Sequence, residues 1–307
     1  MSRYIVTGGA GFIGSNLVRD LVKKGHEVIV VDSMHTGSKE LIKDLDVELY
    51  EMPVHEFYEK GNWKGIDGIY HLGKPSSSPM YKENREKLIE SVQGSIAVLE
   101  MAKELNVKLV SASTSSVYNG LPPPHREDMI IEPTDFYTEA RIFEERTAKV
   151  YEMLYGVKWN EMRFFSVYGP GEQYKKQYAN LVTQFLWAAM KGEEPIIYGN
   201  GEQRRDFIYV EDVVRALELA MASEKNGIYN VGTGISYSLN QVLKMIEEEL
   251  NVKIKPKYIP NPVKNYVMVT QASTEKAYKD LGFKAEVELR EGIRRIAKYY
   301  SSLSNTI

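Results

Sequence analysis

Glycines at positions 8, 11 and 14 follow an apolar segment, Tyr4–Thr7, and open a stretch with helical spacing. Glycine permits a tight turn and lets the backbone approach a pyrophosphate, whose charge then lies against the amides of a helix N-terminus. Asp32 ends the next apolar segment, 18 residues after Gly14, where a carboxylate can accept hydrogen bonds from both hydroxyls of an adenosine ribose. Glycine-rich turns are common, but the strand, the glycines, the helix and the acid together predict a dinucleotide site.

The residues beside these glycines and beside Asp32 complete the expected cofactor site. An acid at this position repels a 2′-phosphate, and no Arg occurs in the following segment 33–37, so NAD is favoured over NADP. The cofactor-binding residues expected in this part of the chain are Gly8, Gly11, Phe12, Ile13, Gly14, Asp32, Ser33 and Gly37.

Composition and charge exclude several classes of function. The 307 residues include 39 Lys+Arg and 42 Asp+Glu, a formal net charge of -3, so no basic surface for a nucleic acid is expected. The apolar runs are far shorter than the roughly 18 residues of a membrane helix, and no membrane association is expected. The absence of Cys suits a reducing compartment, so a cytoplasmic protein is expected. The five His residues show no ligand spacing, and no metal is expected.

Strand-like and helical segments alternate through the first half of the chain. The predicted strands are Tyr4–Thr7, Val28–Asp32, Val47–Tyr50, Gly68–Leu72 and Leu109–Ser113. Nearly all-apolar strands between helices predict a parallel sheet covered on both faces, the doubly wound α/β class. After Pro170 short strands and helices mix, which predicts a smaller mixed α/β second domain. Two long helical segments, 87–105 and 137–155, could present an outer face to a second copy, so a homodimer is expected.

Five further motifs occur along the rest of the chain. They are His71–Gly73, Ser113–Tyr118, Tyr137-x-x-x-Arg141, Arg163–Pro170 and Tyr198–Asp212. With the glycines, they resemble the NAD-dependent epimerase/dehydratase family of extended short-chain dehydrogenases/reductases, and within it the nucleotide-sugar epimerases typified by UDP-glucose 4-epimerase. The resemblance implies a Rossmann-type NAD-binding domain formed by residues 1–168 with 206–233. It also implies a nucleotide-sugar-binding domain formed by residues 169–205 with 234–307.

The resemblance assigns roles to particular residues. Tyr137 would be the acid/base, and Thr114 would hydrogen-bond both Tyr137 and the sugar. A phenol has an ordinary pKa near 10, so it needs a neighbouring cation to act as a base near neutral pH, and Arg141 could supply one. Arg205 would clamp the nucleotide diphosphate with its planar fork. Further cofactor-binding residues would be Leu72, Gly73, Lys74, Tyr137 and Arg141, and substrate-binding residues would be Ser76, Thr114, Ser115, Ser166, Arg205 and Lys264.

Several positions depart from the family pattern. Arg141 replaces the Lys that holds the nicotinamide ribose, Lys74 follows Leu72-Gly73, and Ser91 and Ser166 stand where Asn is usual. The segment 262–272 lacks the Arg that common 4-epimerases place there for the diphosphate. It resembles instead the Tyr-x-x-x-Thr-Gln-Ala of heptose 6-epimerases, with Lys264 as a substitute for the Arg.

The leading interpretation is an NAD-dependent nucleotide-sugar epimerase that oxidises the sugar at C4 and returns the hydride to the opposite face. UDP-glucose and UDP-galactose are the expected pair. One alternative is an enzyme similar to the heptose 6-epimerases. Another is a 4,6-dehydratase, which needs an acid and a base after the Thr, whereas this chain has Ser115 and Ser116. The third alternative is a non-catalytic NAD-binding protein, which the Arg141, Ser91 and Lys74 departures suggest.

Overall fold

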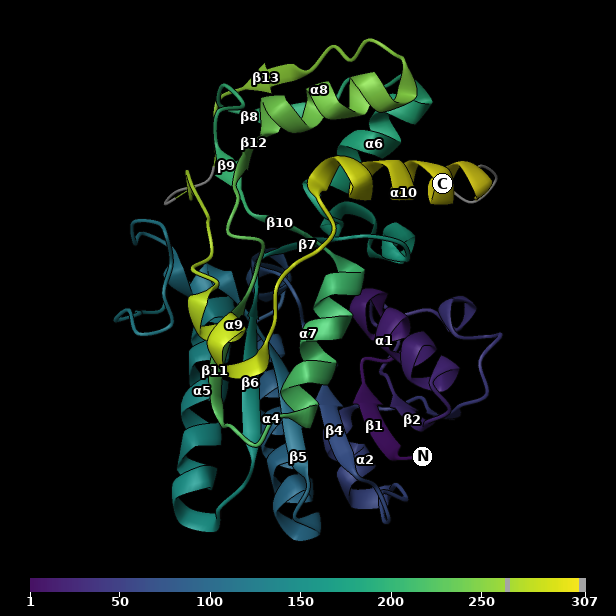
Figure 1. Ribbon diagram of the computed structural model, residues 1–307, viewed down its shortest axis with the longest axis vertical. Helices are drawn as coiled ribbons and strands as arrows, with labels where there is room; N and C mark the ends of the chain where they lie inside the picture. Colours follow the sequence, from purple (N-terminus) through teal and green to yellow (C-terminus); the bar gives the residue numbers. More distant parts are fainter. Residues whose placement is uncertain (263–265, 304–307) are drawn as a thin grey trace.

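A computed structural model describes residues 1–262 and 266–303. Within these residues the largest sheet has seven parallel strands in the order β11-β6-β5-β4-β1-β2-β3 (Figure 1). The strands are β1 (Arg3–Thr7), β2 (Glu27–Val31), β3 (Glu48–Tyr50), β4 (Gly68–His71), β5 (Lys108–Thr114), β6 (Trp159–Phe164) and β11 (Gly227–Val231). The reversal of strand order beside β1 is that of a doubly wound α/β fold, which confirms the predicted class.

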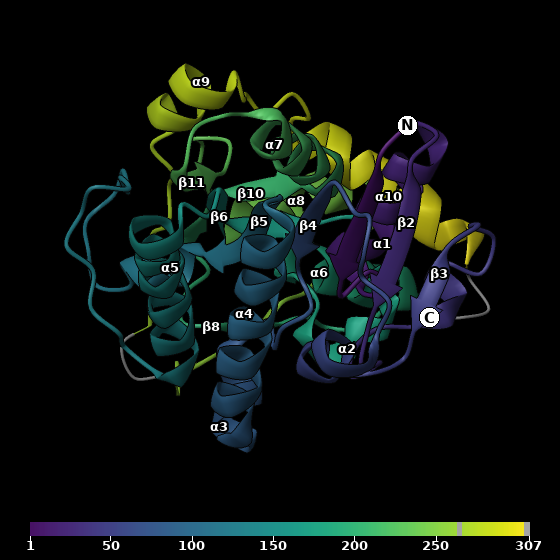
Figure 2. The same cartoon turned by 90° about the horizontal axis from the view of Figure 1, so that it is seen from below.

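Helices cover both faces of this sheet (Figure 2). One core joins the sheet to α1 (Phe12–Lys23), α7 (Val210–Ala222) and α9 (Glu275–Leu281). The other joins it to α2 (Val54–Lys60), α4 (Glu86–Leu105) and α5 (Phe136–Tyr155). Neighbouring residues of one strand enter opposite cores, as Ile5 and Val6 do, because side chains alternate along a strand. Burial on both faces therefore explains the unbroken apolar run at 28–31.

A second region lies above the carboxyl ends of the strands in Figure 1. It contains short strand pairs and three helices around a core of its own. The pairs are β7 (Ser166–Tyr168) with β10 (Phe207–Tyr209), β9 (Arg204–Arg205) with β12 (Tyr237–Ser238), and β8 (Ile196–Tyr198) with β13 (Lys257–Ile259). The helices are α6 (Leu181–Lys191), α8 (Leu239–Leu250) and α10 (Leu289–Ser302).

The remaining elements are short and lie in the connections at the carboxyl ends of the strands. They are the helix α3 (Ser78–Glu83) and the 3-10 turns η1 (Lys39–Leu41), η2 (Ser115–Tyr118) and η3 (Glu172–Tyr178). Buried Asp206, between β9 and β10, accepts hydrogen bonds from the backbone amides of Thr233, Gly234 and Ala272. The Asp206 carboxylate therefore connects the segments that contain residues 233–234 and 272, which are distant in sequence. These segments lie beside the large sheet.

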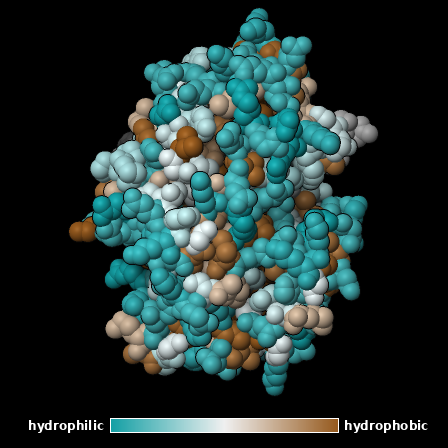
Figure 3. All heavy atoms as spheres, viewed as in Figure 1, coloured by the Kyte–Doolittle hydropathy of each residue, from teal (hydrophilic) through white to brown (hydrophobic). Residues whose placement is uncertain are grey.

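The surface of the face seen in Figure 3 is mainly hydrophilic, with apolar side chains in small scattered groups. Among the helices of residues 1–262 and 266–303, none combines the length and the apolar character needed to cross a bilayer.

Candidate functional site

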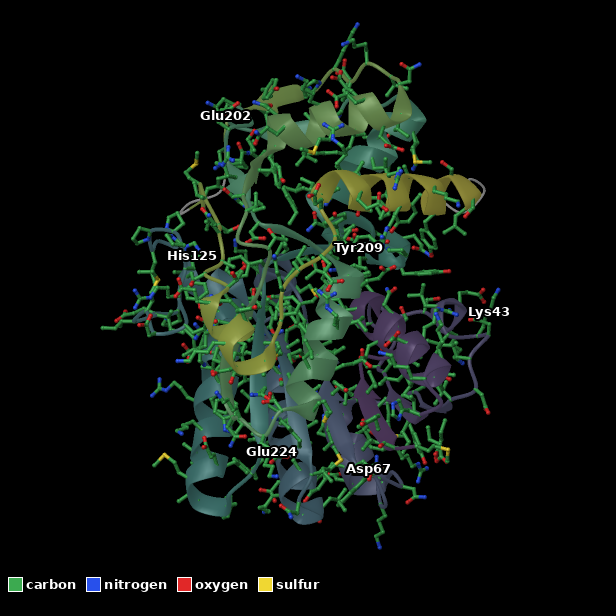
Figure 4. The ribbon with its side chains drawn as sticks, viewed as in Figure 1. Lys43, Asp67, His125, Glu202, Tyr209 and Glu224 are labelled. Atoms are coloured by element: carbon green, nitrogen blue, oxygen red, sulfur yellow. The ribbon has the colours of Figure 1, made fainter. Side chains whose placement is uncertain are left out.

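A pocket lies at the carboxyl ends of β1, β2, β4 and β5, where the large sheet meets the second region. In Figure 4, Asp67 and Glu224 precede β4 and β11 and mark the lower end of the sheet, so the strands run upward toward the region that contains Glu202. Most of the predicted site residues meet in this pocket. They are Gly8, Gly11, Phe12, Ile13, Gly14, Asp32, Ser33, Gly37, Leu72, Gly73, Lys74, Ser76, Thr114, Ser115, Tyr137, Arg141 and Ser166.

The glycine loop leaves room for a ligand against the start of α1. Gly8 has a positive φ of 70°, and a Cβ there would lie 2.6 Å from the backbone nitrogen of Gly73. A Cβ on Gly14 would lie 1.9 Å from the carbonyl oxygen of Gly8, so a side chain would force the loop and helix apart. Helix α1 begins after Gly11 without a side-chain cap and without an acid in its first turn. Its first amides are therefore available to an anion such as a pyrophosphate.

Asp32 is held at the end of β2 by the backbone around it. Its carboxylate oxygens accept hydrogen bonds from the amides of Ala10, at 3.0 Å, and Met34, at 2.8 Å. Burial raises the pKa of the Asp32 carboxyl, and these two hydrogen bonds oppose the rise. A Cβ on Gly37 would lie 2.9 Å from the carboxylate, so glycine keeps that side open. The pocket therefore presents a fixed acceptor where the ribose of an adenosine would lie.

We expect Asp32→Ala to weaken NAD binding roughly 10- to 100-fold, because a hydrogen bond to a charged group contributes about 1.5–3 kcal/mol. Equilibrium titration with NAD and NADP measures both dissociation constants. Asp46→Ala, at an exposed position outside the pocket, is the matched control and should bind NAD like the parent. Tighter binding of NADP than NAD by the unmutated protein would contradict the assignment.

Tyr137 and Thr114 lie at the opposite end of the pocket from Asp32, on α5 and at the end of β5. Asp135 caps α5 by accepting a hydrogen bond from the Thr138 amide, which fixes the helix start beside Tyr137. The Tyr137 ring packs against Tyr81, with centroids 5.6 Å apart. Thr114 accepts a hydrogen bond from the Ser116 amide at 3.1 Å. Both hydroxyl-bearing side chains border the pocket from rigid elements.

Ser91, which replaces the usual Asn, supports this end of the pocket indirectly. Its hydroxyl lies 2.7 Å from the hydroxyl of Tyr81, whose ring contacts Tyr137. Ser91 is buried in α4 and also donates to the carbonyl of Lys87. The Ser91 hydroxyl is therefore hydrogen-bonded, and Tyr81 connects it to the candidate base Tyr137.

Arg141 is buried one helical turn after Tyr137. Its Cζ lies 5.0 Å from the centre of the Tyr137 ring, within cation–π range. One terminal nitrogen donates to Glu144 at 3.0 Å and the other donates to the carbonyl of Pro75. Lys74 donates from the other side to the same Glu144 carboxylate, at 2.6 Å. Two cations beside the pocket therefore share one buried acid.

Glu161 on β6 is a second buried acid near these charges. Burial raises the pKa of its carboxyl to about 8, Lys74 opposes the rise, and Glu144 and Glu145 add to it. One of its carboxyl oxygens has no hydrogen-bond partner among residues 1–262 and 266–303. Near neutral pH the Glu161 side chain is therefore mainly protonated.

This raised pKa makes the stability depend on pH. Between the ordinary Glu pKa of 4.5 and about 8, the folded protein keeps a proton that the unfolded chain releases, so stability falls as pH rises and the loss is complete above pH 8. We expect Glu161→Gln to gain roughly 1–3 kcal/mol relative to the parent between pH 5 and pH 9. Denaturant unfolding at both pH values measures the gain. Exposed Glu132→Gln is the control, and an equal Glu161→Gln effect at both pH values would disprove the shift.

One predicted substrate-binding residue, Arg205, is not among the described residues that line the pocket. Arg205 is partly buried on β9, where it donates to the carbonyl of Arg204 at 2.8 Å. Its Cζ lies over the Tyr266 ring, 5.3 Å from the ring centre. Burial lowers the pKa of the Arg205 guanidinium. Lys264 lies outside the described residues.

Two charged side chains of this site were missed by sequence reasoning. Lys175 in η3 lines the pocket, with its ammonium 5.7 Å from the centre of the ring of Phe12, which follows Gly11. Burial lowers the pKa of Lys175, and nearby Glu172 opposes that change. The other is Glu144. Its spacing of three residues from Arg141 was a usable signal of an ion pair.

No group of three or more His, Asp or Glu side chains in residues 1–262 and 266–303 is arranged to hold a metal ion. The polar groups of the pocket are instead a glycine loop, a ribose-type acceptor and a hydroxyl pair beside two cations. Fold and site together define a dinucleotide-binding α/β protein of the Rossmann type.

Comparison with known proteins agrees with this class. Residues 4–232 match the model of the NAD dependent epimerase/dehydratase family. A Methanocaldococcus jannaschii protein provisionally named UDP-glucose 4-epimerase is 32% identical over 313 residues, covering 98% of this chain and 99% of the relative. UDP-glucuronic acid decarboxylase 1 of Xenopus tropicalis is 31% identical over 307 residues, covering 97% of this chain and 72% of the relative.

A solved structure of UDP-glucose 4-epimerase from Thermotoga maritima, determined with UDP-glucose, superposes with a TM-score of 0.93. Its sequence identity is 31%, and the match covers 98% of this chain and 99% of that one. The chain therefore belongs to the NAD-dependent epimerase/dehydratase family. This result confirms the resemblance drawn from the motifs and confirms NAD as the cofactor. The glycine loop and Asp32 fit that cofactor, as described above.

Proposed function

We propose that the protein is a UDP-sugar 4-epimerase, with UDP-glucose and UDP-galactose as its substrate pair. The observation that carries the proposal is the position of Tyr137 and Thr114, which border the same pocket as the glycine loop and Asp32. Relatives and structural neighbours that are named for UDP-sugars support the substrate class. Bound NAD supplies a reversible hydride acceptor for the sugar C4.

The chain's own residues supply the proton chemistry in this proposal. Tyr137 takes the proton of the C4 hydroxyl as hydride leaves C4, and returns it when hydride adds to the opposite face. Thr114 hydrogen-bonds the same hydroxyl and orients it. Arg141 packs its guanidinium against the Tyr137 ring and holds that ring in place beside the pocket. Ser76, Ser115 and Ser166 also line the pocket and are proposed to contact the substrate.

The residues after Thr114 favour epimerisation over dehydration. Ser115 and Ser116 line the pocket where a dehydratase would need an acid and a base. A hydroxyl cannot replace a carboxylate in abstracting the C5 proton. The 4-keto sugar is therefore retained until hydride returns, and the product is an isomer of the substrate.

Incubation with a panel of UDP-sugars tests this proposal. UDP-glucose, UDP-N-acetylglucosamine and UDP-glucuronate are supplied separately, and the products are identified by NMR and mass spectrometry. The expected product is a C4 epimer of unchanged mass, formed from UDP-glucose. A product lighter by water would indicate a dehydratase, one lighter by carbon dioxide would indicate a decarboxylase, and no conversion would favour a binding protein. Each of these outcomes would overturn the assignment.

The remaining substrate contacts and the domain division also belong to this proposal. Arg205 would clamp the diphosphate, and Lys264 would add a second cation. Residues 1–168 with 206–233 would form the NAD-binding domain, and residues 169–205 with 234–307 would form the nucleotide-sugar domain. The separate cores of the large sheet and of the second region support two domains, but α9 packs in the core of the large sheet, and β7 and β10 contribute to the core of the second region.

We also propose that the protein is a cytoplasmic homodimer formed through α4 and α5. These neighbouring helices carry several exposed apolar side chains, which favour burial against another surface. They are Ile89, Ile96, Val150, Met153, Leu154 and Tyr155. Sedimentation equilibrium should give twice the monomer mass, and Met153→Glu should shift it toward the monomer. A monomer at micromolar concentration would contradict the dimer.

A further inference from the structure

Lys74, Glu144 and Arg141 form one buried unit beside the pocket. Their side chains are exposed by only 2%, 1% and 3%. Glu144 accepts from Lys74 through one carboxylate oxygen, at 2.6 Å, and from Arg141 through the other, at 3.0 Å. The unit joins the loop after β4 to helix α5, because Lys74 comes from the loop and the other two come from the helix. Two cations and one acid leave one net positive charge.

The surrounding groups do not cancel this charge. His71 is buried, and burial with the neighbouring Lys74 and Arg141 holds its pKa well below the usual value, so its ring is neutral. Glu161 is mainly protonated near neutral pH. Glu145 is occupied by Arg163, which donates to it at 2.8 and 2.6 Å. Ser111, which accepts from Lys74, is neutral.

The positive unit lies at the end of the pocket where hydride would move. Arg141 packs on the ring of Tyr137, and Lys74 and Arg141 both line the pocket with Tyr137 and Thr114. The nicotinamide ring is positively charged when oxidised and uncharged when reduced. A fixed positive charge nearby therefore disfavours the oxidised form relative to the reduced form, more strongly in a dry site than in water.

We propose that Lys74, Glu144 and Arg141 together set the redox balance of the bound cofactor, with Glu144 as the positioning residue and counterion that limits their positive charge to one. The inference rests on the proposed function for the location of the nicotinamide beside Tyr137. Removing the acid leaves two unbalanced cations and favours NADH. Removing Lys74 leaves a neutral pair of Arg141 and Glu144 and favours NAD. The opposite signs of these two shifts in the NADH/NAD balance distinguish an electrostatic role from simple loss of packing.

The test is the midpoint potential of the cofactor in the purified holoenzyme, titrated against an external redox couple without any sugar. Glu144→Gln should shift the NADH/NAD ratio on the order of tenfold toward NADH, which is a rise of about 30 mV for a two-electron couple. Lys74→Met should shift the ratio by a similar factor toward NAD. The double variant Lys74→Met with Glu144→Gln leaves Arg141 as the one charge and should return the potential close to that of the parent.

Glu145→Gln is the matched control, because Glu145 is adjacent, equally buried and also paired with an Arg, but Arg163 does not line the pocket. Its potential should equal that of the parent. Shifts of the same sign for Glu144→Gln and Lys74→Met, an equal shift for Glu145→Gln, or no shift at all would overturn the inference. If Glu144→Gln does not fold, Lys74→Met alone decides by its sign. The potential is measured without substrate, so a failure here is separate from a failure to epimerise UDP-sugars.

Discussion

Tyr137→Phe should lower kcat by about 10³-fold or more while the protein still binds NAD. The substitution removes one hydroxyl, the proposed acid/base, and general acid–base catalysis typically contributes 10²–10⁴-fold. The ring remains in place, because its contacts with Tyr81 and Arg141 do not involve the hydroxyl. Turnover of UDP-glucose and the cofactor content of the purified variant are the two measurements.

Tyr155→Phe provides the control for this experiment. Tyr155 ends the same helix, is exposed and lies away from the pocket, so its loss of a hydroxyl should leave kcat unchanged. Retention of more than about a tenth of the parent kcat by Tyr137→Phe would show that another group carries the proton.

Arg141→Ala is expected to damage both stability and turnover. The buried guanidinium donates to Glu144 and to the carbonyl of Pro75, and its removal leaves a cavity and takes a hydrogen bond from one oxygen of the buried Glu144 carboxylate. Together these effects should cost roughly 2–4 kcal/mol of unfolding free energy. The loop after β4 would also lose an anchor on α5, and a small displacement of reacting groups can reduce kcat about a hundredfold. Urea unfolding and kcat for UDP-glucose measure the two effects.

Arg146→Ala, at an exposed position on the same helix, should change neither quantity beyond about 0.5 kcal/mol or twofold. Parent-like stability and turnover in Arg141→Ala would mean that the Arg141 contacts support neither the fold nor the site.

The large sheet was predictable because its strands are apolar and its first turn is rich in glycine. The strand β6 escaped prediction because it contains Asn160, Glu161 and Arg163, polar types that are seldom fully buried. Arg163 is satisfied there by Glu145 on α5, 18 residues earlier in the chain. A local sequence pattern cannot reveal a partner that only the tertiary fold brings into contact.

In the candidate site too, features set by the local sequence were predictable, and contacts made only in the tertiary fold were not. Gly8, Gly14 and Asp32 were predictable because their roles depend on local backbone geometry. The position of Arg141 followed from its spacing to Tyr137, but its partners did not. The Lys74–Glu144 contact joins residues 70 positions apart. Because of this contact, Arg141, which replaces the family Lys, shares the Glu144 carboxylate with Lys74. Lys175 reaches the pocket only through the packing of η3 against α1.

Transient oxidation at C4 with internal return of hydride is tested most directly with UDP-glucose that carries deuterium at C4. The reaction is run in ordinary water, and the product is analysed by NMR and mass spectrometry. We expect UDP-galactose of unchanged mass, with the deuterium retained at C4. Loss of the deuterium to solvent, or a product lacking water, would contradict this mechanism.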